Sequence, residues 1–267
     1  TGILREHDCF RLLTLMSDIP DAEMDELIVA AAKDARAKGI VGITSFEMES
    51  LTDWDRRVAN GFDIIKVNAS LYPDRIQEAY DRGLRTGDRV AGTVSMGFLK
   101  LITDGSINTK TAYMHEPFCG TDIRGGLNTE IAELDRLVAG AKAHGVTPAL
   151  HAIGDRANTV VIDAFEKAGV SGRIEHAQMV RPDDVARMAR LGLTASIQPT
   201  HAVDDRDVAD AQAELLDEER RARLLGRGLA RGGRRLGALE PAEDVLGVVV
   251  LQVVLFADER QFVEVEL

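Results

Sequence analysis

Short apolar runs alternate with amphipathic runs along the first 200 or so residues of this 267-residue chain. The short runs are rich in Val, Ile and Leu, as expected of buried parallel strands. They lie at residues 40–46, 63–68, 97–100, 147–151, 172–176 and 193–199. Because segments with a helical pattern separate them, the pattern predicts repeated strand–helix units and therefore a parallel sheet.

The helical segments carry start and stop signals. Pro73 and Pro182 are each placed to begin a helix at its first position, and Asn128 or Thr129 is placed to cap a third helix. Glycine follows several of these segments, as is common where a helix ends. Helices are predicted over residues 21–38, 51–60, from 73, 130–144, 156–168 and 182–191. The polar, glycine-containing stretch 104–128 is predicted to be a long loop of the kind that carries function.

Three potential metal ligands stand at the ends of separate predicted strands. Lys100 ends the run 97–100, His151 ends 147–151 and His176 ends 172–176. Parallel strands can close a barrel or form an open doubly wound sheet. Polar residues at several strand ends favour the (β/α)8 barrel, whose catalytic residues lie at those ends. The predicted fold class is therefore α/β, a partial (β/α)8 TIM barrel of about six βα units.

The chemistry of these three residues allows several interpretations. Two strand-end histidines in consecutive units indicate a metal site, since neutral imidazole binds zinc, iron or nickel. Either histidine alone would be better explained as a hydrogen-bonded structural residue. Lys100 as an ammonium has no lone pair, so it would bind metal only after carboxylation to a carbamate. Otherwise it is a buried lysine paired with Asp104, or a Schiff-base lysine.

Further polar residues lie close to these strand ends. Asp104 and Asp155 follow Lys100 and His151 by four residues, a placement suited either to orienting a metal ligand or to capping a loop. His201 follows the last predicted strand and is expected to contact substrate. Glu175 precedes His176, so strand alternation places the two on opposite faces, and an ion pair with Arg173 is the expected role of Glu175.

Composition narrows the function classes. The net charge of -12 and the pI of about 5.0 argue against nucleic-acid binding. No run of about 18 apolar residues is present, so no transmembrane helix is predicted, and residues 1–6 do not read as a signal peptide. The two cysteines lie far apart at Cys9 and Cys119. No disulfide framework is expected, and the predicted location is the cytoplasm.

The last sixty residues differ from the rest. From Val208 to Leu267 only ten residue types occur, and the strand–helix alternation stops. One hypothesis is a reading-frame slip just after Asp207, which resequencing of the coding DNA would test. The alternative is a genuine acidic-then-basic helix followed by an apolar strand or helix at residues 245–256. The predicted division is a barrel portion at 1–207 and an atypical, frame-shifted or poorly ordered tail at 208–267.

Five segments, in consistent order over residues 1–207, resemble the amidohydrolase superfamily. Within it they are similar to amidohydrolase family 3, with its exoenzyme-regulatory-protein-like and N-substituted formamide deformylase-like enzymes. The matching segments are Thr-Gly-Ile-Leu-Arg-Glu at 1–6, Lys-Leu-Ile-Thr-Asp-Gly-Ser at 100–106, His-Ala-Ile-Gly-Asp-Arg-Ala at 151–157, Arg-Ile-Glu-His-Ala-Gln at 173–178 and Gln-Pro-Thr-His at 198–201. The segments at 151–157 and 173–178 are the most specific to this branch.

The resemblance implies a (β/α)8 barrel beside a small β-sandwich, with one or two divalent metals activating water against an amide-type C–N bond. Carried over by motif, Lys100 is the bridging carbamate, and His151 and His176 are metal ligands. Zinc is the expected metal, with iron, manganese and nickel as alternatives. Asp104, Asp155 and His201 are assigned to the metal's surroundings or to substrate.

Two departures from the family pattern stand out. The family's His-x-His pair would lie before Thr1, and its strand-eight Asp, expected beyond residue 207, has no Gly-Ser-Asp match; Asp258 lies in a different context. The chain is therefore expected to be truncated at both ends, and without the aspartate the proton shuttle would fail. The two open edges of such a barrel predict association, including homo-oligomers.

The resemblance thus implies a metal-dependent hydrolase that cleaves non-peptide amide or formamide C–N bonds of a small molecule, here in an incomplete version. Two alternatives remain. The chain is a non-catalytic fragment that serves as a binding or oligomerisation module, or it is a barrel lyase that uses Lys100 as a Schiff base. The lack of a phosphate-binding, glycine-rich loop after the last strands weakens the lyase alternative.

Overall fold

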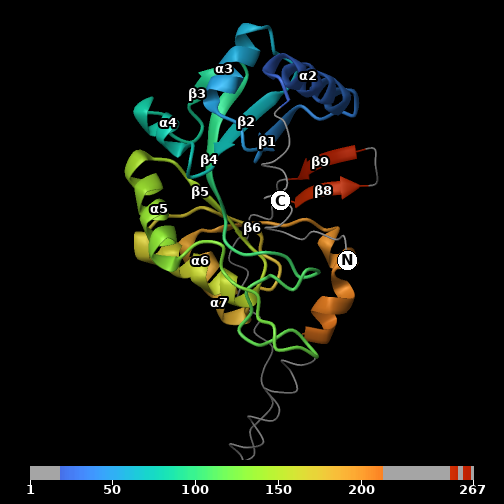
Figure 1. Cartoon of the computed structure of the whole chain (residues 1–267), viewed down its shortest axis with the longest axis vertical. Helices are drawn as coiled ribbons and strands as arrows, with labels where there is room; N and C mark the ends of the chain where they lie inside the picture. The colour runs from blue at the N-terminus through green and yellow to red at the C-terminus, as the bar shows by residue number, and fades with distance from the viewer. Residues whose placement is uncertain (1–18, 213–252, 258–260, 266–267) are drawn as a thin grey trace, which may run out of the picture.

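The computed structural model describes residues 19–212, 253–257 and 261–265. Its main feature is a curled, seven-stranded sheet (Figure 1) in which the order β1-β2-β4-β5-β6-β7 is parallel throughout. The short β3 pairs antiparallel with β4. The strands are β1 Gly42–Ser45, β2 Lys66–Leu71, β3 Arg89–Ala91, β4 Val94–Ile102, β5 Pro148–Ala152, β6 Arg173–His176 and β7 Thr194–Ser196. This arrangement is a half-barrel, so the predicted partial TIM-barrel fold is confirmed.

Helices connect the parallel strands, and α5, α6 and α7 lie along one side of the sheet in Figure 1. Their bounds are α2 Asp21–Ala37, α3 Leu51–Ala59, α4 Ile76–Asp81, α5 Ile131–His144, α6 Asp155–Ala168, α7 Pro182–Leu191 and α8 His201–Asp204. Parallel strands need such crossovers, because a tight turn cannot return the chain to the start of the next strand. The predicted alternation of strand and helix is therefore confirmed.

Local sequence signals explain several helix ends. Ser50 caps α3 in a reciprocal capping box with Asp53, and Pro182 occupies the first position of α7 as predicted. Helices α5, α6 and α7 each end at a glycine with a left-handed backbone, a conformation that glycine adopts without a steric penalty: Gly145, Gly169 and Gly192.

Two hydrophobic clusters hold the described fold together. The larger one joins the helix-facing sides of the strands to the helices, and it includes the fully buried Leu99, Leu150, Ile174, Val161 and Phe165. The smaller one lies within the long loop after β4 and joins it to the end of β5: Ile107, Ala112, Met114, Phe118 and Ile153. The loop therefore has its own apolar anchor and is held against the strand ends.

Two predicted helix starts are wrong. Helix α4 begins at Ile76, after a turn that contains Pro73. Helix α5 is capped by Glu130 and not by Asn128 or Thr129, because the Asn128 amide donates to the backbone oxygen of Asp104 instead. In the second case a tertiary contact uses the side chain that the local pattern assigned to a cap.

The strand β3 was missing from the predicted pattern. It is three residues long and turns back at Gly92 (φ +47°) onto the start of β4. A strand this short has no periodicity of its own to recognise, and its existence depends on the pairing with β4.

Part of the predicted tail lies in the described residues. Residues 253–257 and 261–265 form the antiparallel strands β8 Val253–Ala257 and β9 Gln261–Val265, so the apolar run 245–256 ends in a strand. The described part does not include the motif at residues 1–6, residues 213–252 or Asp258. The predicted division at residue 207 and the frame-slip hypothesis stay predictions.

In the part of the chain that the structure describes, no helix combines the length and apolar character that a membrane crossing needs.

Candidate active site

The strand ends of β4, β5 and β6 bring Lys100, His151 and His176 together. These strands are neighbours in the sheet, with Ile102 opposite His151 and Ala152 opposite His176. The two imidazole rings lie edge to face, 4.6 Å apart between centroids. The charge of Lys100 reaches His176 electrostatically. Three residues that are far apart in sequence thus form one cluster, here called the strand-end cluster.

An unusual backbone conformation places His176 in this cluster. Its φ is +73° and that of Ala177 is +44°, both in the region that residues with a Cβ seldom occupy. In the register of the sheet, Glu175 already stands opposite His151, so strand alternation would turn His176 to the other face. The left-handed backbone brings the His176 ring beside His151 as well. The predicted separation of Glu175 and His176 on opposite faces is therefore wrong. Such local strain is typical of functional sites.

Below the cluster lies a layer of charge and aromatic rings. Arg173 Nε is 3.0 Å from Glu175 Oε1, which confirms the predicted ion pair, and Arg173 also donates to Ser196 Oγ at 2.9 Å. The Lys100 ammonium nitrogen lies 4.9 Å from the Phe46 ring centroid, and the Arg173 guanidinium lies 4.9 Å from that of Phe98. The two cations are thus held over aromatic faces.

Burial lowers the pKa values of two members of the cluster, Lys100 and His176. It lowers the pKa of Lys100 to about 8, opposed by the nearby Glu175 carboxylate and reinforced by Arg173. Burial also lowers the pKa of His176 to about 3, with further contributions from His151 and Lys100. His176 is therefore neutral at pH 7, and about a tenth of Lys100 is unprotonated there. Neutral nitrogen is the form in which either side chain can act as a ligand or nucleophile.

Among the residues that the structure describes, the buried ring nitrogen Nδ1 of His176 finds no hydrogen-bond partner. Leaving a buried polar atom unsatisfied costs about 1–3 kcal/mol, so such atoms call for an explanation. A metal ion or a substrate at the strand ends would supply the missing partner.

Asp104 supports His151. Its carboxylate is fully buried and accepts the backbone N–H groups of Tyr113, Ile153 and Gly154 at 2.8–3.1 Å. Its Oδ1 also lies 3.3 Å from His151 Nε2, which in turn is 3.1 Å from the Gly105 carbonyl oxygen. Asp104 therefore combines both predicted placements, beside the histidine ring and within the loop.

Asp155 does not contact a histidine ring. One carboxylate oxygen accepts the backbone N–H of His115 at 2.8 Å, and the other lies 4.0 Å from Arg181. Of the two placements predicted for Asp155, the structure has the contact with a neighbouring loop. Gly154 beside it approaches Tyr113 so closely that an added Cβ would lie 2.1 Å from the Tyr113 carbonyl oxygen.

His201 lies next to His176, with the ring centroids 5.4 Å apart. Its Nδ1 is 3.2 Å from Asp205 Oδ2, and its side chain is about one-third exposed (34%). The structure thus adds this histidine to the edge of the strand-end cluster, where a substrate can reach it.

Sequence reasoning missed the polar residues around His201. Asp205 is buried and is approached by Asn108, Gln178 and His201. The available signal was the spacing of His201 and Asp205, which places them one helical turn apart. Asn108 and Gln178 come from distant segments, so their approach is visible only in three dimensions.

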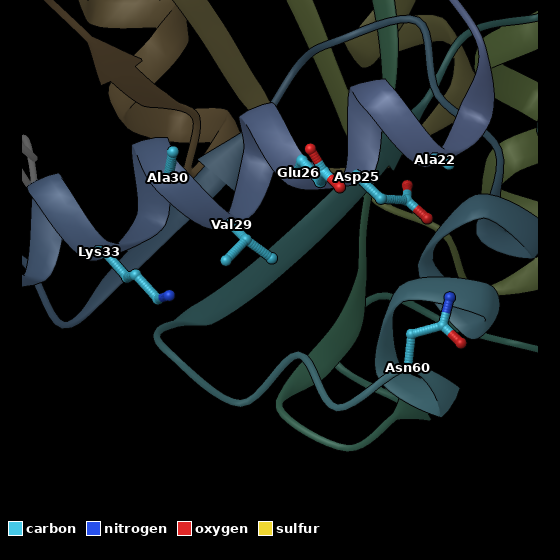
Figure 2. Close-up of a pocket in the computed structure, with 7 residues that line it drawn as sticks. All are labelled: Ala22, Asp25, Glu26, Val29, Ala30, Lys33 and Asn60. Carbon is cyan, nitrogen blue, oxygen red and sulfur yellow. The ribbon is translucent and has the colours of Figure 1, made fainter.

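A separate pocket lies far from this chemistry. It has a volume of about 430 Å³ and lies along α2 and beyond the end of α3, as Figure 2 shows. Its lining residues are Ala22, Asp25, Glu26, Val29, Ala30, Lys33 and Asn60. It contains no histidine and no residue of the strand-end cluster.

The donor set of the strand-end cluster fits a metal ion in part. Two neutral imidazoles lie close together, and one of them has a buried, unpartnered nitrogen. Within the described ranges, however, no group of three or more His, Cys, Asp or Glu side chains is disposed to hold a metal. A third protein ligand from this cluster would have to be Lys100 as a carbamate.

The half-barrel, with Lys100, His151 and His176 near neighbouring strand ends, defines the class as a partial TIM-barrel protein. The model of the Amidohydrolase family matches residues 1–233 of the chain. The chain therefore belongs to amidohydrolase family 3, as its motifs predicted.

Similar proteins support this assignment. The putative amidohydrolase YtcJ of Bacillus subtilis (strain 168) is 26% identical over 93% of this chain and 49% of its own length. Protein LONG AFTER FAR-RED 3 of Arabidopsis thaliana is 33% identical over 52% of the chain and 25% of its own length. The chain thus spans about half or less of the curated relatives that it matches.

Solved structures show the same fold. An uncharacterized metal-dependent hydrolase from Pyrococcus furiosus superimposes with a TM-score of 0.68 at 30% identity, over 77% of this chain and 44% of that one. A second, from Pyrococcus horikoshii OT3, gives 0.67 at 29% identity, over 77% of this chain and 43% of that one.

Proposed function

We propose that this chain carries part of the active centre of a metal-dependent hydrolase that cleaves an amide-type C–N bond, formamides included, in a small molecule. The observation that carries the proposal is the convergence of Lys100, His151 and His176 at three adjacent strand ends, with a buried ring nitrogen left unpartnered. Membership of the family and the two Pyrococcus hydrolases support it.

In this proposal His151 and His176 hold the metal through ring nitrogens, and Lys100 holds it as a carbamate. When bound there, a divalent metal would supply Lewis-acid chemistry, by which a substrate carbonyl is polarised and the pKa of water is lowered. Zinc suits imidazole and carbamate oxygen, as do iron, manganese and nickel. The lowered pKa of Lys100 supports carbamate formation, because only the neutral amine reacts with CO2.

The other residues position these groups. Asp104 lies beside His151 Nε2, and the loop that it organises covers the strand ends. The aromatic rings of Phe46 and Phe98 hold the side chains of Lys100 and Arg173 over their faces. His201 stands at the exposed edge, where it would contact substrate.

We also propose a cytoplasmic location and association of the chain with itself or with other subunits. Among the described strands of the main sheet, β1 and β7 each have a neighbour on one side only. Open edges of this kind favour pairing with another chain. A non-catalytic role as a binding or oligomerisation module would use the same edges.

A second candidate function is a lyase that uses Lys100 as a Schiff base. The observation in its favour is the burial of Lys100 over an aromatic ring with a pKa of about 8, since such a lysine is an activated nucleophile. Borohydride trapping of a carbonyl substrate on Lys100 would support it. In the metal hydrolase, ¹³C-labelled bicarbonate would instead give a carbamate signal that disappears in Lys100→Arg.

The deciding experiment is the metal content of the full chain, purified without chelators and measured by plasma mass spectrometry. We expect stoichiometric metal in the wild type and none in His151→Ala/His176→Ala. The matched control His115→Ala/His144→Ala removes two histidines outside the cluster and should keep the metal. A metal-free wild-type protein, or equal metal in both double variants, would refute the proposal.

A further inference from the structure

Asp205 is a buried carboxylate beside the strand-end cluster that has no place in the ligand set proposed above. It is only 6% exposed. Its Oδ1 accepts from Asn108 Nδ2 in the loop after β4. Its Oδ2 accepts from Gln178 Nε2 at 2.6 Å and lies 3.2 Å from His201 Nδ1. One carboxylate thus joins three segments at the strand ends.

The position of Asp205 along the chain suggests a simpler role, which its contacts do not support. It directly precedes the helical residues 206–212, where an aspartate commonly caps the first backbone N–H groups. In the described part of the chain, its oxygens instead receive side chains from outside that helix. A buried carboxylate is stable only when it is well hydrogen-bonded, and here the donors come from the site.

We infer that Asp205 is a positioning residue that fixes the neutral tautomer of His201. An ionised carboxylate only accepts hydrogen bonds, so the ring nitrogen that faces it must carry the proton. The proton of neutral His201 is therefore on Nδ1, and Nε2 remains an acceptor. A carboxylate that faces one ring nitrogen in this way sets which nitrogen remains available.

The accepting nitrogen is available to a ligand. The His201 side chain is 34% exposed, and its ring lies 5.4 Å from that of His176. Asp205 also orients Gln178. It accepts a hydrogen bond from the side-chain amide nitrogen of Gln178, so that Oε1 of Gln178 remains an acceptor. Asp205 therefore gives this side of the site an accepting character.

This character indicates a substrate class, a step that rests on the hydrolase function proposed above. An acceptor at His201 suits a substrate with an N–H or O–H group next to the bond that is cleaved. A secondary amide provides such a donor, and its N-methylated analogue does not. A polar site rejects a ligand that leaves its hydrogen bond unmade.

The tautomer can be measured directly by long-range ¹H–¹⁵N NMR on the full chain at about pH 8.5, where histidine is neutral. The signals of His201 are assigned by their loss in His201→Gln. We expect the Nδ1–H form in the wild type and in Asp204→Ala, an exposed neighbour of Asp205. In Asp205→Ala the ring should change to the Nε2–H form or to a mixture.

An Nε2–H tautomer in the wild type would overturn the inference, and this result does not require any variant to fold. An unchanged tautomer in folded Asp205→Ala would also overturn it.

The substrate class is tested with a secondary amide and its N-methyl analogue. We expect kcat/KM to favour the secondary amide roughly tenfold in the wild type and to lose that preference in Asp205→Ala. Equal rates in the wild type would contradict the substrate class, whereas hydrolysis of neither amide would contradict the proposed hydrolase and leave the tautomer result to decide the role of Asp205.

Discussion

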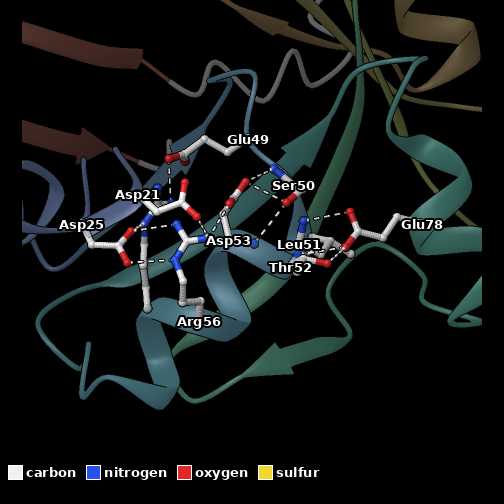
Figure 3. Close-up of polar contacts among 10 residues, drawn as sticks. Asp21, Asp25, Glu49, Ser50, Leu51, Thr52, Asp53, Arg56 and Glu78 are labelled. Atoms are coloured by element: carbon white, nitrogen blue, oxygen red, sulfur yellow. Dashed lines mark hydrogen bonds and ion pairs between the residues drawn. The ribbon is translucent and has the colours of Figure 1, made fainter. Parts of the chain in front are cut away.

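Two polar regions of this molecule differ in how their charged and titratable side chains are paired. Between α2 and α3, acidic and basic side chains alternate in a network that Figure 3 shows. Arg56 binds both carboxylate oxygens of Asp25 at 3.0 Å and Asp53 at 2.8 Å. The buried Arg57 lies 2.8 Å from Asp25 and 2.6 Å from Glu49. Here each charge lies next to an opposite charge.

The strand-end cluster instead gathers basic nitrogens. Lys100, His151, His176 and His201 lie close together, and burial and mutual repulsion lower the pKa of His176 to about 3. In the network between α2 and α3, neighbouring side chains instead favour the charged form of a titratable group. Hydrogen bonds from Arg56 and Arg57 lower the pKa of Asp25 and stabilise its charge. The network between α2 and α3 therefore stabilises the ionised form of Asp25, whereas the strand-end cluster favours the neutral form of His176. Shifted pKa values of the second kind are typical of functional sites.

The largest expected stability effect comes from removing a cation from the network. Arg57→Met removes the buried cation beside Asp25 and Glu49. Asp25 keeps Arg56, but Glu49, whose pKa burial already raises, loses its ion-pair partner. We expect a loss of about 3–5 kcal/mol in the free energy of unfolding, measured by urea denaturation.

The control for this variant is Arg75→Met, which breaks an exposed contact of 3.7 Å with Asp74. Its cost should be under about 0.5 kcal/mol. Equal costs in the two variants would show that the network is no more than a surface feature.

The lowered pKa of His176 in the strand-end cluster should make the stability of the fold depend on pH. In the folded chain the pKa of His176 is about 3, well below its ordinary value of 6.5. Between these values the unfolded chain binds the extra proton, so metal-free wild-type protein should lose about 2 kcal/mol from pH 7 to pH 5.

In His176→Gln this part of the pH dependence should disappear, while His144→Gln, outside the cluster, should retain it. Urea denaturation at both pH values measures the difference. A slope that is the same in all three proteins would mean that His176 is not buried in its neutral form.

The smallest expected effect concerns Asp53. Burial opposes its ionisation, but hydrogen bonds from Ser50 and Arg56 outweigh that and lower its pKa to about 2. Its ionised form therefore stabilises the fold above pH 4, and this contribution is lost as the pH falls through 2. Because the carboxylate is 30% exposed, we expect Asp53→Asn to cost only about 1 kcal/mol at pH 7.

The cost of the same variant should shrink towards pH 2, where about half of the wild-type carboxylate is itself protonated. Thermal unfolding at the two pH values checks this. A cost that is independent of pH would assign the role of Asp53 to the geometry of the capping box and not to its charge.

Much of the fold was predictable from the sequence, because apolar periodicity reports burial directly. All six predicted strands exist, and α7 begins at Pro182 as its sequence indicates. Strand β3 and the capping of α5 were not predictable. The first depends on pairing with β4, and the second on a competing contact of Asn128 with Asp104. Both are decided by segments distant in the sequence.

The candidate site was predicted in the same uneven way. The motifs identified Lys100, His151 and His176, and the structure brings them together. They did not reveal that a left-handed backbone at His176 brings its ring to the same side as Glu175. Nor did they reveal Asp205, because its partners Asn108 and Gln178 belong to other parts of the chain.

By itself, the sequence determined the alternation of the six main strands with helices, the family, and the polar residues near the strand ends; β4 and β5 run on past Lys100 and His151 to Ile102 and Ala152. The alternation, the family and these polar residues follow from local periodicity and from short motifs. Only the tertiary structure decided which side chains meet, which are buried without a partner, and how far their pKa values move. Those properties depend on distance and on exclusion of water, and both arise only when distant segments pack together.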